Sequence, residues 1–447
     1  MPMFRRKAVD SLKDWKEKLA PKYAALLEGA RRVGKSTIAE EFAKEHYRSY
    51  IKIDFANISA DLSDVFTDIT TLDLFFLRLQ TVTGVTLYRR ESVIIFDEIQ
   101  LRPSVRQAIK YLVADGRYDY IETGSLITIR KNVRGIVIPS EEHKIPVYPM
   151  DYEEFMWATG NDSYGVLRDL YRLGSPVGNG TNRKLMRDFR IYMAVGGMPQ
   201  AVQAYVDGRD FSQIDTVKRE IISLYVDDFK KIDSSGLIGR MYKSIPSQLA
   251  TGKRRYVVSA ATQKRKTGRD LERLSDLLDS KTVIPCYNAL NPGVSLSQTR
   301  DDDSYKLYLS DTGLFTTMLF DASPGAESTI YSKLLSDKLP ADLGYLYENV
   351  VAQMIASTNR ELYYHTWNKA GSTHYYEVDF IVQAGSKIIP LEVKSSGSRM
   401  HESIDVFCGK YSKYIRDAFL LSQKDVGHQE QLKSKPVYML PFILEEL

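Results

Sequence analysis

The stretch from Leu26 to Ser36 limits the possible folds of this chain more than any other, because it fits the pattern G-x-x-x-x-G-K-[ST]. Gly29, Gly34, Lys35 and Ser36 occupy the four fixed positions. Glycine lets the backbone curl closely around an oligophosphate, so that successive N–H groups point at its oxygens. In such a loop Lys35 reaches the β- and γ-phosphates and Ser36 holds Mg²⁺.

The sequence on either side has the order that a phosphate-binding loop requires. A short apolar run from Tyr23 to Leu27 predicts a strand, and residues Ser36 to His46 have a helical pattern. The alternative is a chance match in a turn that contains glycine. If the match is functional, the residues expected to contact a nucleotide are Gly29, Ala30, Arg31, Arg32, Val33, Gly34, Lys35, Ser36 and Thr37.

A second element favours the functional interpretation. Residues Val93 to Phe96 form a continuous apolar run that ends in Asp97 and Glu98, as expected for a buried parallel strand whose C-terminal tip faces a nucleotide. Asp97 can complete the Mg²⁺ shell, and Glu98 can orient the attacking water. Taken alone, two acidic residues after a strand also fit a solvated loop. Paired with the loop at Gly29, they favour a nucleotide site.

Length, charge and cysteine content limit the class of protein only broadly. The 447 residues leave room for several domains, and a net charge of +4 permits nucleic-acid binding without arguing for it. Cys286 and Cys408 lie far apart and outside any C-x-x-C pattern, which fits a reducing cytoplasm. The first residues lack the apolar core of a signal peptide, and no run of about 18 apolar residues occurs. We therefore expect a cytoplasmic protein without a membrane partner.

Residues 1–150 predict an α/β domain. Strands alternate with helices in this part of the chain, which indicates a right-handed parallel sheet covered on both faces. Beyond the elements already described, we expect strands at Tyr50–Phe55, Tyr118–Ser125 and Lys144–Met150, and helices at Leu72–Thr83 and Val105–Ala114.

The strand expected at 118–125 ends in residues with hydroxyl groups. Thr123 or Ser125 at its tip could sense the γ-phosphate, although an ordinary turn around Gly124 is the alternative. Arg134, a little further on, could reach the γ-phosphate bound by a neighbouring subunit, which would require a homo-oligomer. A solvated surface arginine is the alternative.

Residues 151–239 have a helical pattern. The expected helices are Tyr152–Thr159, Lys184–Val195 and Phe211–Lys231. A stretch rich in Gly, Pro and Asn, residues Gly174–Asn182, predicts a flexible loop. The motif Gly196-Gly197-Met198-Pro199 is interpreted as a simple helix boundary.

Residues 240–334 predict a winged-helix-like segment. Helices are expected at Tyr242–Ala250 and Gly268–Leu278, and Lys281–Asn288 is expected to pair with Tyr305–Leu309 as the wing. Residues 253–273 carry eight basic residues against two acidic ones: Lys253, Arg254, Arg255, Lys264, Arg265, Lys266, Arg269 and Arg273. Such a cluster could follow the phosphate backbone of DNA. A solvated face is the alternative.

Residues 335–447 predict a third α/β domain with a second candidate site. A helix at Leu346–Ala356 contains Glu348, and Asp379 and Glu392-Val393-Lys394 fall on neighbouring expected strands. Two carboxylates there could hold Mg²⁺ while the amine lowers the pKa of a bound water. A cross-strand charge ladder is the alternative.

Taken together, the motifs resemble those of the prokaryotic AAA-type ATPases that carry a C-terminal domain of unknown function. The motifs are Gly29–Ser36, Asp97-Glu98, Thr123-Gly124-Ser125, Gly196–Pro199, Lys306–Leu314 and Tyr347–Val351. The resemblance implies an ATP- and Mg²⁺-binding AAA-like domain, a helical lid, a winged helix and a terminal domain similar to restriction-endonuclease-like nucleases. Its nuclease-like positions correspond to Glu348, Asp379, Glu392 and Lys394. Val378 departs from the nuclease motif, which has Pro there, and Arg32 stands where the phosphate loop often has Gln.

Three functions follow from these observations. The first is ATP hydrolysis that drives the winged-helix and nuclease-like modules, with action on DNA as one outcome. The second is a nucleotide-gated switch or docking scaffold, and the third is an ATP-gated, metal-dependent nuclease. Glu98 favours hydrolysis, because a module that only binds nucleotide has no need of a carboxylate that orients water.

Overall fold

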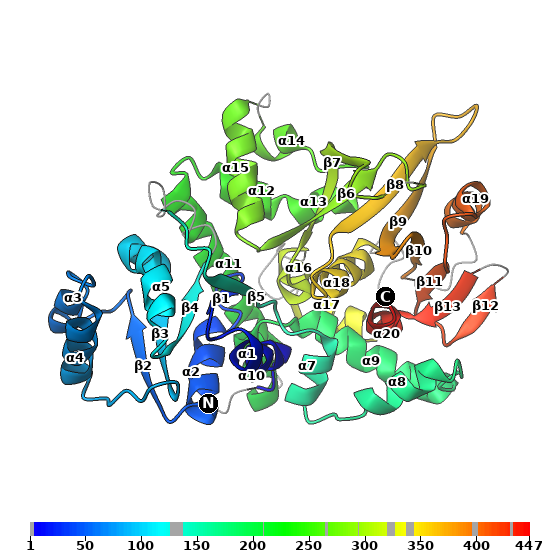
Figure 1. The fold of residues 1–447 in the computed structure, drawn as a ribbon. Coiled ribbons are helices and arrows are strands. Elements are labelled where there is room, and N and C mark those ends of the chain that lie inside the picture. Colours follow the sequence, from blue (N-terminus) through cyan, green and yellow to red (C-terminus); the bar gives the residue numbers. More distant parts are fainter. Residues whose placement is uncertain are drawn as a thin grey trace. The chain divides into compact units, whose positions relative to one another are not determined.

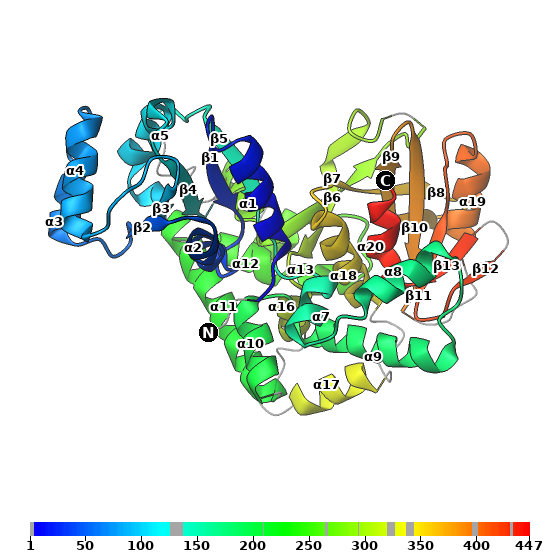
Figure 2. The same cartoon turned by 60° about the horizontal axis from the view of Figure 1, so that its bottom comes forward.

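The structure is a computed structural model that describes residues 4–125, 137–208, 210–263, 267–293, 295–319, 327–336, 344–395, 401–429 and 432–447. It divides into two compact units (Figures 1 and 2). The first unit runs to Tyr148 and includes residues 279–281, and the second comprises residues 149–278 and 282–447. Within the ranges just given, each unit contains one β-sheet.

The sheet of the first unit has five parallel strands in the order β2-β3-β4-β1-β5, which confirms the predicted parallel α/β domain. A single strand, β4, separates β1 from β3. The carboxyl ends of β1, β3 and β4 therefore lie at the same edge of the sheet. The elements of this unit are α1 (Lys7–Lys18), β1 (Ala24–Glu28), α2 (Lys35–His46), β2 (Ser49–Asp54), α3 (Ala60–Val65), α4 (Leu72–Thr83), β3 (Ser92–Asp97), η1 (Ile99–Leu101), α5 (Pro103–Asp115), β4 (Asp119–Gly124) and β5 (Glu142–Pro146).

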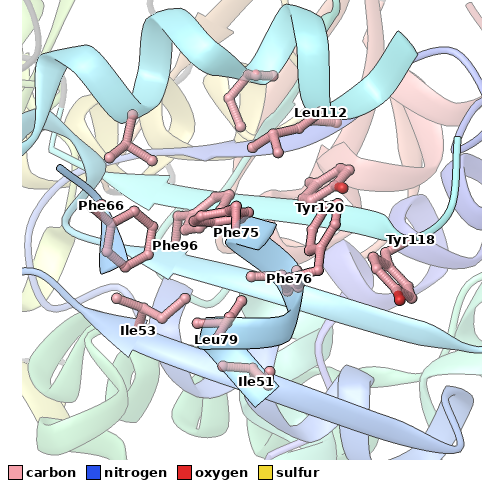
Figure 3. Close-up of a cluster of buried hydrophobic side chains, with 14 of the residues drawn as sticks. Ile51, Ile53, Phe66, Phe75, Phe76, Leu79, Phe96, Leu112, Tyr118 and Tyr120 are labelled. Atoms are coloured by element: carbon pink, nitrogen blue, oxygen red, sulfur yellow. The ribbon is translucent and has the colours of Figure 1, made fainter. Parts of the chain in front are cut away.

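Alternation along the strands decides which helices cover each face of this sheet. Ile51 and Ile53 of β2 and Phe96 of β3 face a cluster that also contains apolar residues of α4 and α5 (Figure 3). Aromatic rings fill much of this cluster, and Phe66 packs edge-on against Phe75. Helix α2 packs against β2, β3 and β4 without joining the cluster, so it covers the opposite face. Both faces of the sheet are thus buried, as its apolar strands require.

The second unit begins with helices and continues into a mixed sheet of eight strands in the order β12-β13-β11-β10-β9-β8-β6-β7. Its helices are α7 (Tyr152–Ala158), α8 (Tyr164–Arg172), α9 (Asn179–Val195), α10 (Pro199–Gly208), α11 (Phe211–Ile232), α12 (Leu237–Lys243), α13 (Ile245–Ala250), α14 (Val258–Thr262), α15 (Gly268–Asp279), α16 (Thr312–Leu319), α17 (Glu327–Leu335), α18 (Gly344–Ala356), α19 (Glu402–Tyr411), η3 (Val437–Met439) and α20 (Leu440–Glu445). Its strands are β6 (Val283–Ala289), β7 (Arg300–Leu309), β8 (Leu362–Asn368), β9 (Tyr375–Ala384), β10 (Lys387–Val393), β11 (Phe419–Ser422), β12 (Gly427–Gln429) and β13 (Leu432–Pro436).

The hairpin expected as a wing belongs to this larger sheet. Strands β6 and β7 pair antiparallel, with Val283 opposite Leu309. Strand β6 also pairs in parallel with β8, where Cys286 lies opposite Leu362. The hairpin therefore lies in the same sheet as β8, β9 and β10, which come from the C-terminal part of the chain. Helix α18 packs against β6, β7, β8 and β10, and α19 packs against β9 and β10.

Two glycine motifs in the second unit pack backbone against backbone. The Gly197 N–H donates to Asp311 Oδ2 at 2.6 Å, and the Met150 N–H donates to the Gly197 carbonyl at 2.7 Å. A Cβ on Gly197 would overlap the backbone of Met150, and a Cβ on Gly313 would overlap the Val195 carbonyl. These glycines are needed for close approach, so the motif at 196–199 does more than end a helix.

Several expected boundaries differ from the structure. The last strand of the first sheet, expected at Lys144–Met150, is Glu142–Pro146, and the second strand of the expected wing begins at Arg300 and not at Tyr305.

The expected helix Tyr242–Ala250 is interrupted, because α12 ends at Lys243 and α13 begins at Ile245, followed by Pro246. Proline has no N–H and its ring clashes with the preceding turn, so one helix cannot run through this point.

The expected loop at 174–182 is shorter than predicted, since α9 begins at Asn179. The Val177 and Gly178 N–H groups donate to the Asp425 carboxylate at 3.1 and 2.8 Å. The Asn182 amide donates to the Gln423 carbonyl at 2.9 Å. Contacts with residues far along the chain therefore fix the start of this helix.

None of the helices in the described ranges combines the length and apolar character needed to span a membrane.

Candidate functional site

The predicted phosphate loop joins β1 to α2 in the first unit. Gly34 has φ 97° and precedes the first turn of α2, so Lys35 and Ser36 are the first residues of the helix. Arg32 has φ 71°, in the left-handed region that few residues other than glycine adopt. The turn exposes the first N–H groups of a helix of 12 residues, where the helix dipole favours an anion.

Close packing beneath the loop explains the first glycine. A Cβ on Gly29 would overlap the carbonyl oxygen of Val147, which follows β5. The buried Arg6 guanidinium donates to the Val33 carbonyl at 2.8 Å and to the Tyr148 carbonyl at 2.7 Å. Arg6 thus holds the loop against the segment after β5, a role that the sequence analysis missed.

The Lys35 ammonium lies inside the loop. It is 8% exposed and donates to the Gly29 carbonyl at 3.0 Å and to the Ala30 carbonyl at 2.9 Å. Burial lowers the pKa of Lys35 to about 8, although Glu98 and Asp97 favour its charged form. Lys35 is therefore a cation held in a poorly hydrated loop, where an added phosphate would interact with it strongly.

Asp97, at the end of β3, connects the loop to the neighbouring strand. Its Oδ1 accepts hydrogen bonds from Ser36 Oγ, at 2.6 Å, and from Thr123 Oγ1 at the end of β4. Its Oδ2 lies 3.7 Å from Lys52 Nζ of β2. Three elements thus bring a carboxylate and two hydroxyls to one point, where the Ser36 hydroxyl and the Asp97 carboxylate could hold Mg²⁺.

Lys52 was not predicted as a site residue. Its ammonium also donates to Glu40 Oε2 of α2 at 2.8 Å. Burial opposes the charge, but the Glu40 hydrogen bond and the Asp97 carboxylate outweigh it and raise the pKa of Lys52. Lys52 therefore keeps a positive charge beside Asp97.

Glu98 is held by its own backbone and by a neighbour. It has φ 56°, which is uncommon for a residue other than glycine. Its Oε2 accepts a hydrogen bond from the Gln100 side chain, and Gln100 is buried. The Glu98 N–H points to Thr123 Oγ1 at 3.5 Å. Strain of this kind is typical of functional positions, and Gln100 fixes the direction of the carboxylate.

The structure thus brings Lys35, Ser36, Asp97, Glu98 and Thr123 together, as the sequence predicts. Among the other loop residues expected to contact a nucleotide, Ala30 and Val33 are buried, whereas Thr37 is exposed. Ser125 lies just beyond β4, at the same edge of the sheet. Arg134 lies outside the described residues.

Comparison with known proteins fits this geometry. Residues 21–156 match the family model of the AAA domain. The match and the loop together support an AAA-type P-loop domain that binds a nucleotide. Residues 186–324 match the model "Domain of unknown function (DUF8612)", and residues 343–440 match "Domain of unknown function (DUF4143)". These descriptions name neither a winged helix nor a nuclease, so both assignments stay predictions.

Comparisons with curated proteins and with solved structures do not identify a function. No curated protein matches the chain. A solved structure of Pif1 helicase from Candida albicans is 14% identical to this chain, with a TM-score of 0.22. The match covers 42% of this chain and 48% of the helicase chain, about half its length.

The second candidate site lies in the sheet of the second unit. Asp379 Oδ2 accepts the Val393 N–H at 2.8 Å, and Glu392 Oε1 accepts Lys394 Nζ at 2.7 Å. Glu348 of α18 accepts the Tyr308 hydroxyl at 3.0 Å. Burial, reinforced by the Glu392 and Glu348 carboxylates, raises the pKa of Asp379 well above its ordinary value. The four predicted residues are neighbours, but each carboxylate already has a protein donor.

The basic residues at 253–273 do not share one environment. Arg273 is buried and bonds to Asp233 at 3.0 Å and to Asp270 at 2.8 Å, so it does not face solvent. The Arg254 guanidinium lies over the Tyr375 ring, 3.6 Å from its centre. Lys253, Arg255 and Arg269 are exposed, and Lys264, Arg265 and Lys266 lie outside the described residues.

Proposed function

We propose that the AAA domain hydrolyses ATP in the presence of Mg²⁺. The observation that carries this proposal is the junction at Asp97, where Ser36 Oγ donates at 2.6 Å beside the Thr123 hydroxyl. Such a junction links the phosphate loop to the tips of two strands. Glu98 follows immediately, with its carboxylate oriented by Gln100.

Each residue has a separate part in this proposal. The loop N–H groups and Lys35 bind the phosphates, and Lys35 would exchange the Gly29 and Ala30 carbonyls for phosphate oxygens. Ser36 and Asp97 would hold Mg²⁺, which when bound would supply positive charge to stabilise the transferring phosphoryl group. Glu98 orients the attacking water. Thr123 and Lys52 keep the Asp97 carboxylate in position.

The finer parts of the proposal concern assembly and substrate. We propose that Arg134 completes the site of a neighbouring subunit in a homo-oligomer, because in the sequence it comes shortly after β4, the strand that carries Thr123. We also propose that hydrolysis moves the second unit, with DNA contacted through the exposed Lys253 and Arg255. A docking scaffold is the second candidate for the terminal module, favoured by the protein donor that each of Glu348, Asp379 and Glu392 already has.

Nucleotide binding and Mg²⁺-dependent phosphate release test the central proposal. The wild type is expected to bind a fluorescent ATP analogue and to release phosphate only when Mg²⁺ is present. Lys35→Ala is expected to weaken binding, because the phosphates lose their charged partner. Lys44→Ala, on the exposed side of the same helix, is the matched control and should bind as the wild type does. Equal affinity in Lys35→Ala and Lys44→Ala would rule out the proposed site.

A further inference from the structure

A buried lysine from the β6–β7 hairpin lies among the carboxylates of the second candidate site. Lys306 of β7 is 5% exposed, and its Nζ donates to Glu377 Oε1 of β9 at 2.6 Å. The same Nζ lies 3.8 Å from Glu348 Oε2 of α18. Tyr308, two residues along β7, donates to that Glu348 oxygen at 3.0 Å. The expected wing thus supplies a cation and a hydroxyl to the cluster.

The acidic cluster is defined here as Glu348, Glu377, Asp379 and Glu392. Two ammonium groups, from Lys306 and Lys394, lie within it, each bonded to a different carboxylate. Burial disfavours the Lys306 ammonium, but the Glu377, Glu348 and Asp379 charges outweigh burial and raise its pKa well above the ordinary value. The carboxylates that contact Lys306 thus stabilise its charged form.

The residues present do not fit a divalent ion. Mg²⁺ requires several oxygen ligands in near-octahedral geometry. Within the described ranges, no set of three or more His, Cys, Asp and Glu residues is arranged so that it could hold a metal ion. Glu348 and Glu377 instead turn their bonded oxygens toward Tyr308 and Lys306. A divalent ion would also meet the repulsion of the Lys306 ammonium.

Two oxygens in the cluster lack a donor. Glu377 Oε2 and Glu392 Oε2 are buried and have no hydrogen-bond partner. A buried carboxylate oxygen without a partner is costly, so these atoms would accept a further cation if the resident one were removed. They lie on β9, which also carries Asp379, and on β10, which ends one residue before Lys394.

We propose that Lys306 is the resident cation of the acidic cluster and that it keeps divalent ions out of the cluster. The terminal module is then not a metal-dependent nuclease while Lys306 is in place, although its nuclease-like residues are complete. Lys306 and Glu377 are not among the four nuclease-like positions Glu348, Asp379, Glu392 and Lys394, so their charge pair is additional to those positions.

A pair of substitutions separates Lys306 from the rest of the cluster. Lys306→Met combined with Glu377→Gln removes one ammonium and one carboxylate, so the formal charge of the cluster is unchanged. The full chain is titrated with Mn²⁺ without nucleotide, and bound Mn²⁺ is counted by electron paramagnetic resonance. Thermal melts with and without millimolar Mn²⁺ provide a second readout. Lys306→Arg, which keeps the cation, is the matched control.

We expect the double variant to bind one Mn²⁺ more than the wild type and to melt about 3 °C higher when that site is saturated. Adding Asp379→Asn should remove both effects, and Lys306→Arg should behave as the wild type does. Mn²⁺ binding by the wild type that Asp379→Asn abolishes would overturn the proposal. So would a double variant that binds no additional Mn²⁺. If the double variant does not fold, the wild type and Asp379→Asn alone still decide, since equal Mn²⁺ binding by these two supports exclusion.

Discussion

Lys35 is buried in the phosphate loop, so its ammonium is poorly hydrated before any phosphate binds. Its ammonium is enclosed by the loop and bonded to two backbone carbonyls, and its pKa is lowered to about 8 by burial. The lowering from 10.5 corresponds to about 3 kcal/mol of destabilisation at neutral pH. Two hydrogen bonds of about 1 kcal/mol each offset part of this cost. Binding function and stability therefore oppose each other at this residue.

We predict that Lys35→Met stabilises the nucleotide-free protein by about 1 kcal/mol, since it removes the buried charge and the two hydrogen bonds together. Denaturant unfolding of the first unit at pH 7 measures this difference. The same variant should lose affinity for ATP. A Lys35→Met protein less stable than the wild type would mean that the two carbonyl contacts outweigh the burial of the charge.

The stability difference should also depend on pH. Between pH 8 and 10.5 the folded Lys35 has lost its proton while the unfolded residue keeps it, so the unfolded state binds more protons. Stability of the wild type relative to Lys35→Met therefore rises with pH through this window. Unfolding of both proteins at several pH values checks the prediction. A difference that stays constant from pH 7 to pH 10 would contradict the lowered pKa of Lys35.

Close contact between glycine motifs connects elements in the second unit. Gly197 lies between the backbone of Met150 and the side chain of Asp311. Asp311 begins the turn before α16, and the Thr312 N–H donates to Gln353 of α18 at 2.8 Å. Helix α18 is therefore joined to the start of the unit through buried backbone groups.

We predict that Gly197→Ala destabilises the second unit by about 3 kcal/mol or more, because its Cβ would overlap the Met150 backbone, which cannot move aside. Gly180→Ala, in the first turns of α9, is the matched control, since a Cβ there meets nothing. Replacing a helical glycine by alanine should be neutral or stabilising by up to about 1 kcal/mol. Equal melting temperatures for the two variants would show that Gly197 can be replaced freely.

The elements that the sequence predicts well are those whose pattern is local. Residues 72–83 carry helical periodicity and form α4 with the expected bounds. The interruption at Pro246 also has a local signal, the proline itself, although one helix was expected there. The residues around the start of α9 do not predict where it begins, because the segment before it is held by Asp425, far along the chain.

At the scale of the whole molecule, contacts between residues that are far apart in the sequence are the ones that the sequence does not predict. The phosphate loop and the Asp97 strand are recognised because spacing and residue type carry their chemistry. Lys306 contacts Glu377 from 71 residues away, and Lys52 meets Asp97 only because β2 lies beside β3. Lys306 opens the motif at 306–314, but that motif does not indicate its carboxylate partner, and no short pattern marks Lys52. The continuity of β6 with β8 is likewise a property of the sheet and not of either strand.

The proposed DNA binding should depend on the exposed part of the basic segment. We predict that Lys253→Ala with Arg255→Ala reduces the salt dependence of duplex binding by up to about two counterions, with little effect on sequence preference. Lys230→Ala, on an exposed position of α11, is the control. Affinity measured at several salt concentrations checks this. An unchanged salt slope would assign Lys253 and Arg255 to a solvated face.

The most direct test of the account compares Glu98→Gln with the wild type in both ATP affinity and phosphate release. The amide keeps the shape of Glu98 but lacks the negative charge that polarises water, so affinity should stay within about twofold while turnover falls at least 100-fold. Gln100→Ala should show a smaller loss of turnover, because the carboxylate remains but is no longer oriented. Wild-type turnover in Glu98→Gln would contradict hydrolysis at this site.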